Sequence, residues 1–503
     1  MTNFLRILKS KLNENHGILL LGIFLLFLAI ASPWFNLSVS NHSIVKSYFA
    51  SFGISTLLFL VLLNNCRNSD ITLKINYIKL SLISLFIFGT LSISWSVNFD
   101  LAVGKWLLWV ISAFSFLFAL NLSINYGSSI KIAWSLTIAA FAIAIIGLLQ
   151  YYFNPFSLRE ATTIASTFGN KNIATEVLVL IFPLSIFLLF SSKVQGIKVW
   201  ILLGIISLII TYVIFTSTRA AWIAISVELF CIALYFIIKR SEIIHWINWN
   251  KNKKNAIIVA LIVTLTLLNI NPYDDPNSFN DTSQQPEYEI TSPQDHNASA
   301  SSVYLRIQIW QVGIKMILDS PLIGTGLGSF SQNIGNEGYA SWIINNTLRA
   351  HNDLIELAVE LGLIGIAFFL IVAVSLIISV NGILKRTNGE IHLFFFFIFT
   401  SLLGSFINLQ FSSPYQMAFP LVLFGLYAGL IAKQADATSA PLKIIIFSVK
   451  LIHKKVILLI SFILIFIIYF FTYFQWILAY EQLDKISITE DFSQLDVIET
   501  PVY

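Results

Sequence analysis

Long apolar runs recur along most of the chain, with short polar segments between them. A helix that crosses a bilayer needs about 20 mainly apolar residues. Thirteen runs approach or reach this length, at about 17–35, 48–65, 80–96, 106–124, 132–153, 173–191, 199–216, 220–238, 256–270, 361–381, 392–410, 417–432 and 456–475. The ninth run is the shortest, and every later span reverses direction if it does not cross. The pattern predicts an all-α polytopic membrane protein with about 12–13 transmembrane helices.

The longest polar interruption, at 271–351, separates the ninth and tenth predicted spans. Its first part, 271–302, is rich in Asp, Asn, Ser, Gln and Pro and has almost no hydrophobic period, which is typical of a flexible segment. From about 303 to 319 apolar residues recur at helical spacing, which predicts a helix on the membrane surface with Arg306 near its start.

Composition and charge agree with the membrane class. Hydrophobic residues make up 57% of the chain and charged residues only 11%, whereas soluble proteins carry about 25% charged residues. With the N-terminus inside, 21 of the 30 Lys and Arg residues fall in cytoplasmic segments, as the positive-inside rule requires. The large polar loop and the C-terminal tail are then outside.

The outward basic residues are informative because the positive-inside rule gives no reason for them. Lys105 follows Asp100, and we expect a local ion pair between the two. Arg159 and Lys171 flank a loop with two turn signals. Arg219 ends a tight turn, TSTR, between two spans.

Two further features lie in and after the large loop. Alternating glycines in SPLIGTGLGSF can present backbone N–H groups to an anion, or can form a tight turn that returns the chain to the membrane, and both interpretations stay open. His351 then opens a helical segment in which Asn352, Glu356 and Glu360 share one face. A polar stripe that enters a membrane helix should face protein or water.

Four segments carry a resemblance to a known family, in this order: STFGNKNIATEVLVLIFPL at 166–184, STRAAWIA at 217–224, LRIQIWQVGIKMILDSPLIGTGLGSF at 305–330 and RAHNDLIELAVELGLIGI at 349–366. They resemble the O-antigen ligase-like superfamily, which includes O-antigen ligases, O-antigen polymerases and protein O-oligosaccharyltransferases of bacteria. The resemblance covers about 160–430. The thirteenth span and the short outer tail depart from the family.

The resemblance implies transfer of a glycan from undecaprenyl diphosphate to an acceptor hydroxyl at the periplasmic face of the bacterial inner membrane. It also implies a metal-independent enzyme without a cofactor that inverts the transferred sugar. Matched by motif, the catalytic residues are Arg219, Arg306 and His351. We expect N-terminal helices at 1–160, a catalytic membrane core at 160–432 with the periplasmic loop 271–351, and an extra helix with a short tail at 433–503.

The chemistry suits these residue types. Breaking a sugar–diphosphate bond leaves negative charge on the phosphate, and the external loop offers no compact carboxylate cluster to hold magnesium. Arg219 and Arg306 can replace the metal, because arginine stays charged and binds phosphate through two N–H groups. The acceptor hydroxyl needs a base with a pKa near 7, which fits His351.

Lys171, Arg349 and Arg159 are expected to bind the diphosphate or the sugar. Glu356 is a further candidate at the binding site, either orienting His351 or forming an interhelical hydrogen bond. Trp310 can stack on a sugar ring, but we favour the interpretation that it seats the loop at the membrane interface.

Several functions fit the sequence. The main prediction is a ligase of lipopolysaccharide or surface polysaccharide biosynthesis, whose acceptor is a glycolipid of the lipid A-core type. A polymerase would use a lipid-linked glycan as acceptor and a protein O-oligosaccharyltransferase a protein hydroxyl, with the same donor. A small-solute transporter or a scaffold of the cell envelope are the rivals from other classes. Membrane lipids are expected partners, and nucleic acid is not.

Overall fold

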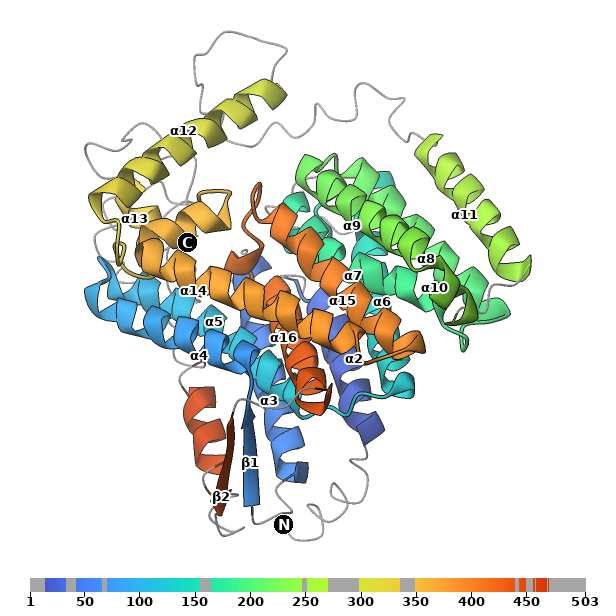
Figure 1. Cartoon of the computed structure of the whole chain (residues 1–503). Helices are drawn as coiled ribbons and strands as arrows, with labels where there is room; N and C mark the ends of the chain where they lie inside the picture. The colour runs from blue at the N-terminus through green and yellow to red at the C-terminus, as the bar shows by residue number, and fades with distance from the viewer. Residues whose placement is uncertain are drawn as a thin grey trace.

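The computed structural model describes residues 14–32, 42–65, 70–153, 164–246, 251–269, 298–334, 349–438, 443–448, 456, 458–467 and 469. Nearly all of this is helical (Figure 1). The α-helices are α2 (Glu14–Ile30), α3 (His42–Asn65), α4 (Tyr77–Ser92), α5 (Phe99–Leu120), α6 (Tyr126–Phe153), α7 (Lys171–Phe190), α8 (Ile197–Phe215), α9 (Arg219–Ile238), α10 (Arg240–Trp246), α11 (Lys251–Asn269), α12 (Ala298–Asp319), α13 (Phe330–Ile334), α14 (Asp353–Leu384), α15 (Gly389–Asn408) and α16 (Ala418–Thr438). Short 3-10 helices η2 (Ile93–Trp95), η3 (Ser166–Phe168) and η4 (Pro414–Gln416) lie between them.

Each of the thirteen predicted spans contains helix within the described residues. Ten of these described helices are long and apolar enough to cross a membrane: α3 to α9 and α14 to α16. Two shorter apolar helices, at 17–30 and 458–467, correspond to the first and last predicted spans. The ninth predicted span forms α11, whose first turn contains three lysines that lower its hydropathy. The predicted class, an all-α polytopic membrane protein, is confirmed.

Helices α7 and α16 form the centre of the bundle. In each of them 83% of the most apolar stretch is buried within the protein, against 22% for α9 at the periphery. Helix α5 packs along α16, α15 along α7, and α2 along α6. Because lipid surrounds such a bundle, the apolar side chains exposed on α9 and α11 face the membrane and do not destabilise the fold.

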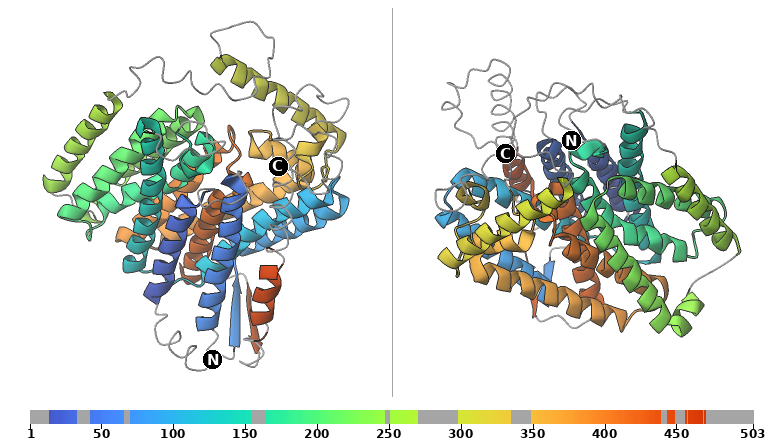
Figure 2. Two further views of the ribbon diagram at one scale, coloured as in Figure 1. Left: turned by 180° about the vertical axis from the view of Figure 1, so that it is seen from behind. Right: turned by 90° about the horizontal axis from the view of Figure 1, so that it is seen from above.

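A two-stranded antiparallel sheet lies at the end of the bundle opposite α12 (Figures 1 and 2). Strand β1 (Asp70–Ile75) pairs with β2 (Lys443–Ser448), with Leu73 opposite Ile445. An ion pair between Lys79 and Asp436 joins the helices that adjoin the two strands. This sheet was not predicted from the sequence, because two six-residue strands in loops far apart in the chain carry little signal on their own.

The predicted surface helix is α12, which lies across the start of α14 at the other end of the bundle (Figure 1). The two helices approach closely where Gly313 faces Ile355, and a small apolar cluster that includes Ile309 and Val359 fills the space around this contact. Most of the expected flexible segment, 271–302, lies outside the described residues.

The glycine-rich turn after α12 is a structural turn. The N–H groups of Thr325 and Gly326 donate to the carbonyls of Val359 and Glu360, at 3.0 and 2.8 Å. A Cβ atom on Gly324, whose φ is +66°, would lie 2.4 Å from the Glu360 carbonyl carbon. Since protein carbonyls already occupy these N–H groups, the structure favours the tight turn over the anion-binding interpretation.

The same contact breaks α14. Gly362 has φ +63° and interrupts the helical backbone. The N–H groups of Leu363 and Ile364, which follow the break, donate to Pro321 and Leu322 of the glycine-rich segment. The loop therefore replaces hydrogen bonds that the kinked helix cannot make, and this fixes α12 against the bundle.

Candidate active site

The sequence GNKN sets the start of α7 and the position of Lys171. Gly169 has φ +71°, which glycine adopts without strain. Asn170 is the N-cap, and its side-chain oxygen accepts from the N–H of Asn172 at 2.8 Å. Lys171 is therefore the first residue of α7, at the end of the helix where backbone N–H groups and the helix dipole favour an anion.

Arg219 is the first residue of α9. The turn before it is sharp, because Ser217 has φ +53°. The hydroxyl of Thr218 donates to the side-chain oxygen of Asn172 at 3.3 Å, which ties this turn to the start of α7. The basic residues that begin α7 and α9 are thereby held at the same end of the bundle.

A pocket of about 490 Å³ joins these two turns to α12. It is lined by three basic residues, by polar side chains of the two turns and by apolar and polar residues from the chain after α15: Lys171, Asn172, Ser217, Thr218, Arg219, Ala220, Trp222, Arg306, Phe411 and Ser412. Three cations from three separate helices thus border one pocket, and together they favour an anion with more than one negative charge.

Arg306 is half-buried in α12. Burial lowers its pKa, and the nearby guanidinium of Arg219 lowers the pKa further. The group still stays charged at neutral pH, since an arginine side chain is very difficult to deprotonate. The repulsion between two adjacent cations would be relieved by a bound phosphate, which is the usual arrangement at sites that accept such groups.

His351 does not line this pocket but lies close enough to Arg306 to be affected by its charge. Its pKa is lowered from 6.5, mainly by burial and next by Arg306, while Glu356 acts in the opposite direction. The imidazole is therefore neutral at pH 7 and can accept a proton. His351 has φ +49°, a left-handed conformation that is uncommon for residues other than glycine.

The residue after His351 is held in place by hydrogen bonds on both sides. Asn352 caps α14, and its side-chain oxygen accepts from the N–H groups of Leu354 and Ile355 at 3.0 and 3.2 Å. Its amide N–H donates to the carbonyl of Gln410 at 3.1 Å. The helix start is thus fixed on both sides, and the strained backbone of His351 is held by its surroundings.

Glu356 holds the chain segment that carries His351. This carboxylate is 1% exposed, and it forms an ion pair with Arg349 at 3.1 Å. Its second oxygen accepts from the backbone N–H of Ala350 at 3.3 Å. On the opposite side of the same segment, the indole N–H of Trp310 donates to the carbonyl of Ala350 at 2.9 Å. Trp310 therefore connects the helix of Arg306 to the segment of His351.

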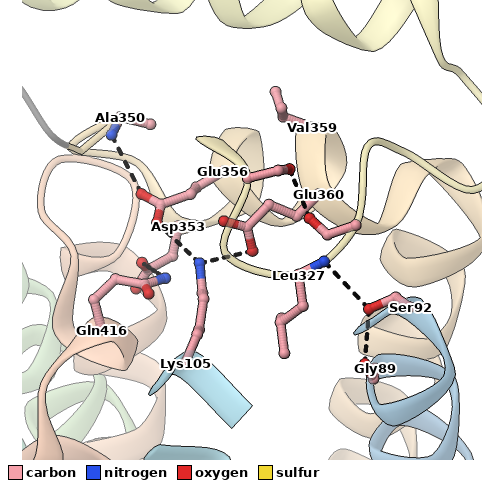
Figure 3. A network of polar contacts seen from close by, with 12 residues as sticks. Gly89, Ser92, Lys105, Leu327, Ala350, Asp353, Glu356, Val359, Glu360 and Gln416 are labelled. Carbon is pink, nitrogen blue, oxygen red and sulfur yellow. Dashed lines mark hydrogen bonds and ion pairs between the residues drawn. The ribbon is translucent and has the colours of Figure 1, made fainter. Parts of the chain in front are cut away.

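Lys105 differs from its predicted role. The predicted ion pair with Asp100 is wrong, because both residues lie in α5, and side chains five residues apart point about 140° away from one another around a helix. Lys105 instead reaches α14, where its ammonium lies 2.9 Å from Glu356 and 2.7 Å from Glu360 (Figure 3). The sequence offered one signal that could have found this pairing, an outward lysine in an apolar helix and an acidic stripe without an assigned cation.

Asp353 joins this network to the pocket wall. Its two oxygens accept from the N–H of Tyr415 at 3.0 Å and from the side-chain amide of Gln416 at 3.1 Å (Figure 3 shows the second contact). Its own N–H donates to Leu409. Asp353 thereby fixes the segment that contributes Phe411 and Ser412 to the pocket, neither of which was singled out from the sequence.

The structure brings together most of the candidate residues. Lys171, Arg219 and Arg306 line the pocket, while His351, Arg349 and Glu356 form the adjacent segment. Arg159 lies outside the described residues. Within the part of the chain that the structure describes, no group of three or more His, Cys, Asp or Glu side chains is placed to hold a metal ion.

Part of the chain matches a known family. Residues 203–370 match the family model described as O-antigen ligase (Wzy_C), and among curated proteins none matches the chain. The matched region includes Arg219, Arg306 and His351, whereas Lys105 and Lys171 precede it. The match supports the resemblance of the chain to the O-antigen ligase-like superfamily.

Proposed function

We propose that the protein transfers a glycan from undecaprenyl diphosphate to an acceptor hydroxyl at the periplasmic face of the bacterial inner membrane. The observation that carries this proposal is the shared pocket of Lys171, Arg219 and Arg306, with His351 beside Arg306. A diphosphate needs several cations, and the attacking hydroxyl needs a base. Both requirements are met within a small region of the protein.

In the proposed step, the acceptor oxygen attacks the anomeric carbon of the donor glycan. The bond between that carbon and the phosphate oxygen breaks, and its electron pair leaves with the diphosphate. Arg219 and Arg306 neutralise the charge that develops on the leaving group, and they do so most strongly in the transition state. Lys171 binds the same diphosphate as a point charge.

His351 takes the proton of the acceptor hydroxyl as the new bond forms. Its pKa is lowered, so the neutral form that can accept a proton predominates at pH 7. A single displacement of this kind inverts the configuration of the transferred sugar. Lys171, Arg219 and Arg306 provide the positive charge for the leaving group in the proposed step, and this step involves neither a cofactor nor a metal ion.

The position of the pocket suits a lipid-linked donor. Arg219 begins α9, and Trp222, one turn further along, lines the pocket and is 42% exposed. Further along α9, the side chains of Ile223 and Phe230 are exposed. A diphosphate bound at Arg219 would therefore leave its polyprenyl chain beside an apolar helix surface at membrane depth.

The ligase reaction onto a lipid A-core type glycolipid is the favoured form, because the matching family model is described as O-antigen ligase. Polymerisation and protein O-glycosylation share the donor step and differ in the acceptor. The cationic pocket and His351 serve the donor and the proton transfer, which all three reactions share, and the three acceptors are distinguished by experiment.

The test uses purified protein in nanodiscs with an undecaprenyl-diphosphate-linked glycan and, in separate reactions, each of the three acceptor classes. We expect transfer by the wild type and loss of transfer in Arg306→Ala and His351→Ala. Lys315→Ala is the matched control, since Lys315 is an exposed cation of the same helix about 180° around from Arg306. Transfer that survives both substitutions at wild-type rate would disprove the proposal.

A further inference from the structure

We propose that Lys105 of α5 is a positioning residue for this site, acting through Glu356 on the segment 349–351 that carries His351. The inference rests on the proposed function and adds a residue that lies outside the matched domain at 203–370. Lys105 touches neither the pocket nor His351. It forms an ion pair with the Glu356 carboxylate, and this carboxylate binds Arg349 and the N–H of Ala350 in the segment that carries His351.

The contacts form a continuous chain from α5 to the base. The ammonium of Lys105 donates to Oε1 of Glu356 at 2.9 Å. The same carboxylate accepts from Arg349 at 3.1 Å and from the N–H of Ala350 at 3.3 Å, the residues just before His351. Figure 3 shows the Lys105 side chain between the carboxylates of Glu356 and Glu360.

The charge balance of this cluster depends on Lys105. Two carboxylates, each 1% exposed, form ion pairs with two cations, Lys105 and Arg349, and the buried Asp353 carboxylate interacts with both Glu356 and Lys105. Without Lys105 the two carboxylates would remain buried beside one another with one cation, which is unfavourable in a low-dielectric region. The carboxylate of Glu356 would also lose the ammonium that fixes its Oε1, and a displacement of this carboxylate weakens its hold on Ala350.

Helices α4 and α5 support the site by a second set of contacts. The hydroxyl of Ser92 accepts from the N–H of Leu327, and that of Ser96 donates to the Leu327 carbonyl at 2.8 Å. A Cβ atom on Gly326 would lie 2.3 Å from Cα of Ser96. Helices α4 and α5, with the turn between them, thus contact both the glycine-rich turn that follows α12 and the carboxylates of Glu356 and Glu360.

This arrangement predicts which kinetic constant changes. Lys171, Arg219 and Arg306 are the proposed donor-binding residues, whereas the ion pairs that the structure describes for Lys105 are with Glu356 and Glu360, so donor affinity should persist when Lys105 is replaced. The position of the His351 imidazole, in contrast, should change. We expect Lys105→Met to lower kcat by on the order of 100-fold and to change the Kd for undecaprenyl diphosphate by less than about 3-fold.

Two further variants separate positioning from a general loss of folding. Lys105→Arg keeps the charge and should retain much of the rate. In Lys105→Met/Glu360→Gln one cation and one carboxylate are both removed, so Arg349 and Glu356 remain as a balanced pair, and we expect kcat to recover at least tenfold over the single variant. Lys253→Met is the matched control, because Lys253 is also buried but donates to Ser191, at the other end of α7 from Lys171.

Hydrogen exchange gives a readout that does not require activity. Because the Ala350 N–H is bonded to Glu356, the peptide 349–353 should exchange faster in Lys105→Met and return toward the wild-type rate in the double variant. If the wild-type protein transfers no glycan while the variants show this exchange pattern, the proposed function is overturned and the coupling between Lys105 and the His351 segment stays intact.

The opposite results would overturn the inference. One is a Lys105→Met variant with wild-type kcat and wild-type exchange. Another is a variant in which kcat and donor affinity fall together and the double substitution restores neither, since that would indicate a general structural role. All measurements use the full chain in nanodiscs, with undecaprenyl diphosphate as the binding probe.

Discussion

Arg219 and Arg306 line the same pocket, although one begins α9 and the other lies in α12, within the long polar loop. Their charges are close enough for Arg219 to lower the pKa of Arg306. Such a pair is unfavourable without an anion and favourable with one. The relationship therefore supports the proposed binding of a phosphorylated donor.

The geometry of the guanidinium should matter as well as its charge. Arg306→Lys keeps a cation but loses the planar group that can bind two phosphate oxygens, so we expect a measurable loss of kcat/KM. Arg306→Ala removes the charge too and should lower kcat by about 100-fold or more. Steady-state kinetics with the purified protein measures both. Equal activity of the lysine and wild-type proteins would contradict a two-oxygen contact.

The pH dependence follows from His351. The neutral imidazole is the active form, so kcat/KM should be level near pH 7 and fall as the pH drops through the lowered pKa, below 6.5. The charged groups that act on His351 are Arg306, Arg349 and Glu356. Arg306→Gln removes a cation and should move this acid limb to higher pH, whereas Glu356→Gln should move it to lower pH.

A pH–rate profile of each variant tests these signs, with Lys315→Gln as the control for a lost cation on α12. A limb that stays in place in both Arg306→Gln and Glu356→Gln would show that His351 is not the group that titrates.

Trp310→Phe separates two roles of the indole. If Trp310 acts through its N–H, which donates to Ala350, phenylalanine should destabilise the protein by about 1 kcal/mol and lower kcat. If the ring stacks on a sugar, phenylalanine should keep most of the activity, since it also offers an aromatic face. Thermal unfolding and kcat, measured on the same preparation, distinguish the two.

The break in α14 should depend on glycine. Gly362→Ala places a Cβ atom 2.3 Å from the carbonyl oxygen of Leu322 at a backbone with φ +63°. We expect a loss of at least about 2 kcal/mol of stability from strain and displacement, visible as a lower Tm. Gly204→Ala is the control, because no atom lies within 4 Å of its added Cβ. Equal Tm values for the two variants would argue against a structural need for the break.

Much of the fold could be predicted from sequence because a membrane span needs a long apolar run, and such runs are visible without any tertiary information. The surface helix was visible for a similar reason, since Ile307, Ile314 and Ile317 repeat at helical spacing. Turns were predicted before Lys171 and Arg219, where α7 and α9 begin, and the helical segment predicted to open at His351 begins at Asp353. These features depend on neighbouring residues, so they can be recognised in a short stretch of sequence.

The parts that were not predicted depend on partners distant in the chain. Lys105 was assigned to the nearest acid, Asp100, because its true partners on α14 lie far along the sequence. Ser412 enters the pocket through the anchoring of its segment by Asp353, and nothing in its own surroundings indicates this. The sheet of β1 and β2 was missed for the same reason.

Two asparagines stand directly beside candidate functional residues and act only on the backbone: Asn170 before Lys171, and Asn352 after His351. Replacing either one would shift its basic neighbour without removing any group that meets the substrate. In a mutational scan both positions would score as essential and be mistaken for members of the reaction centre. When such a scan is interpreted, Asn170 should therefore be treated as the N-cap of α7 and Asn352 as the N-cap of α14.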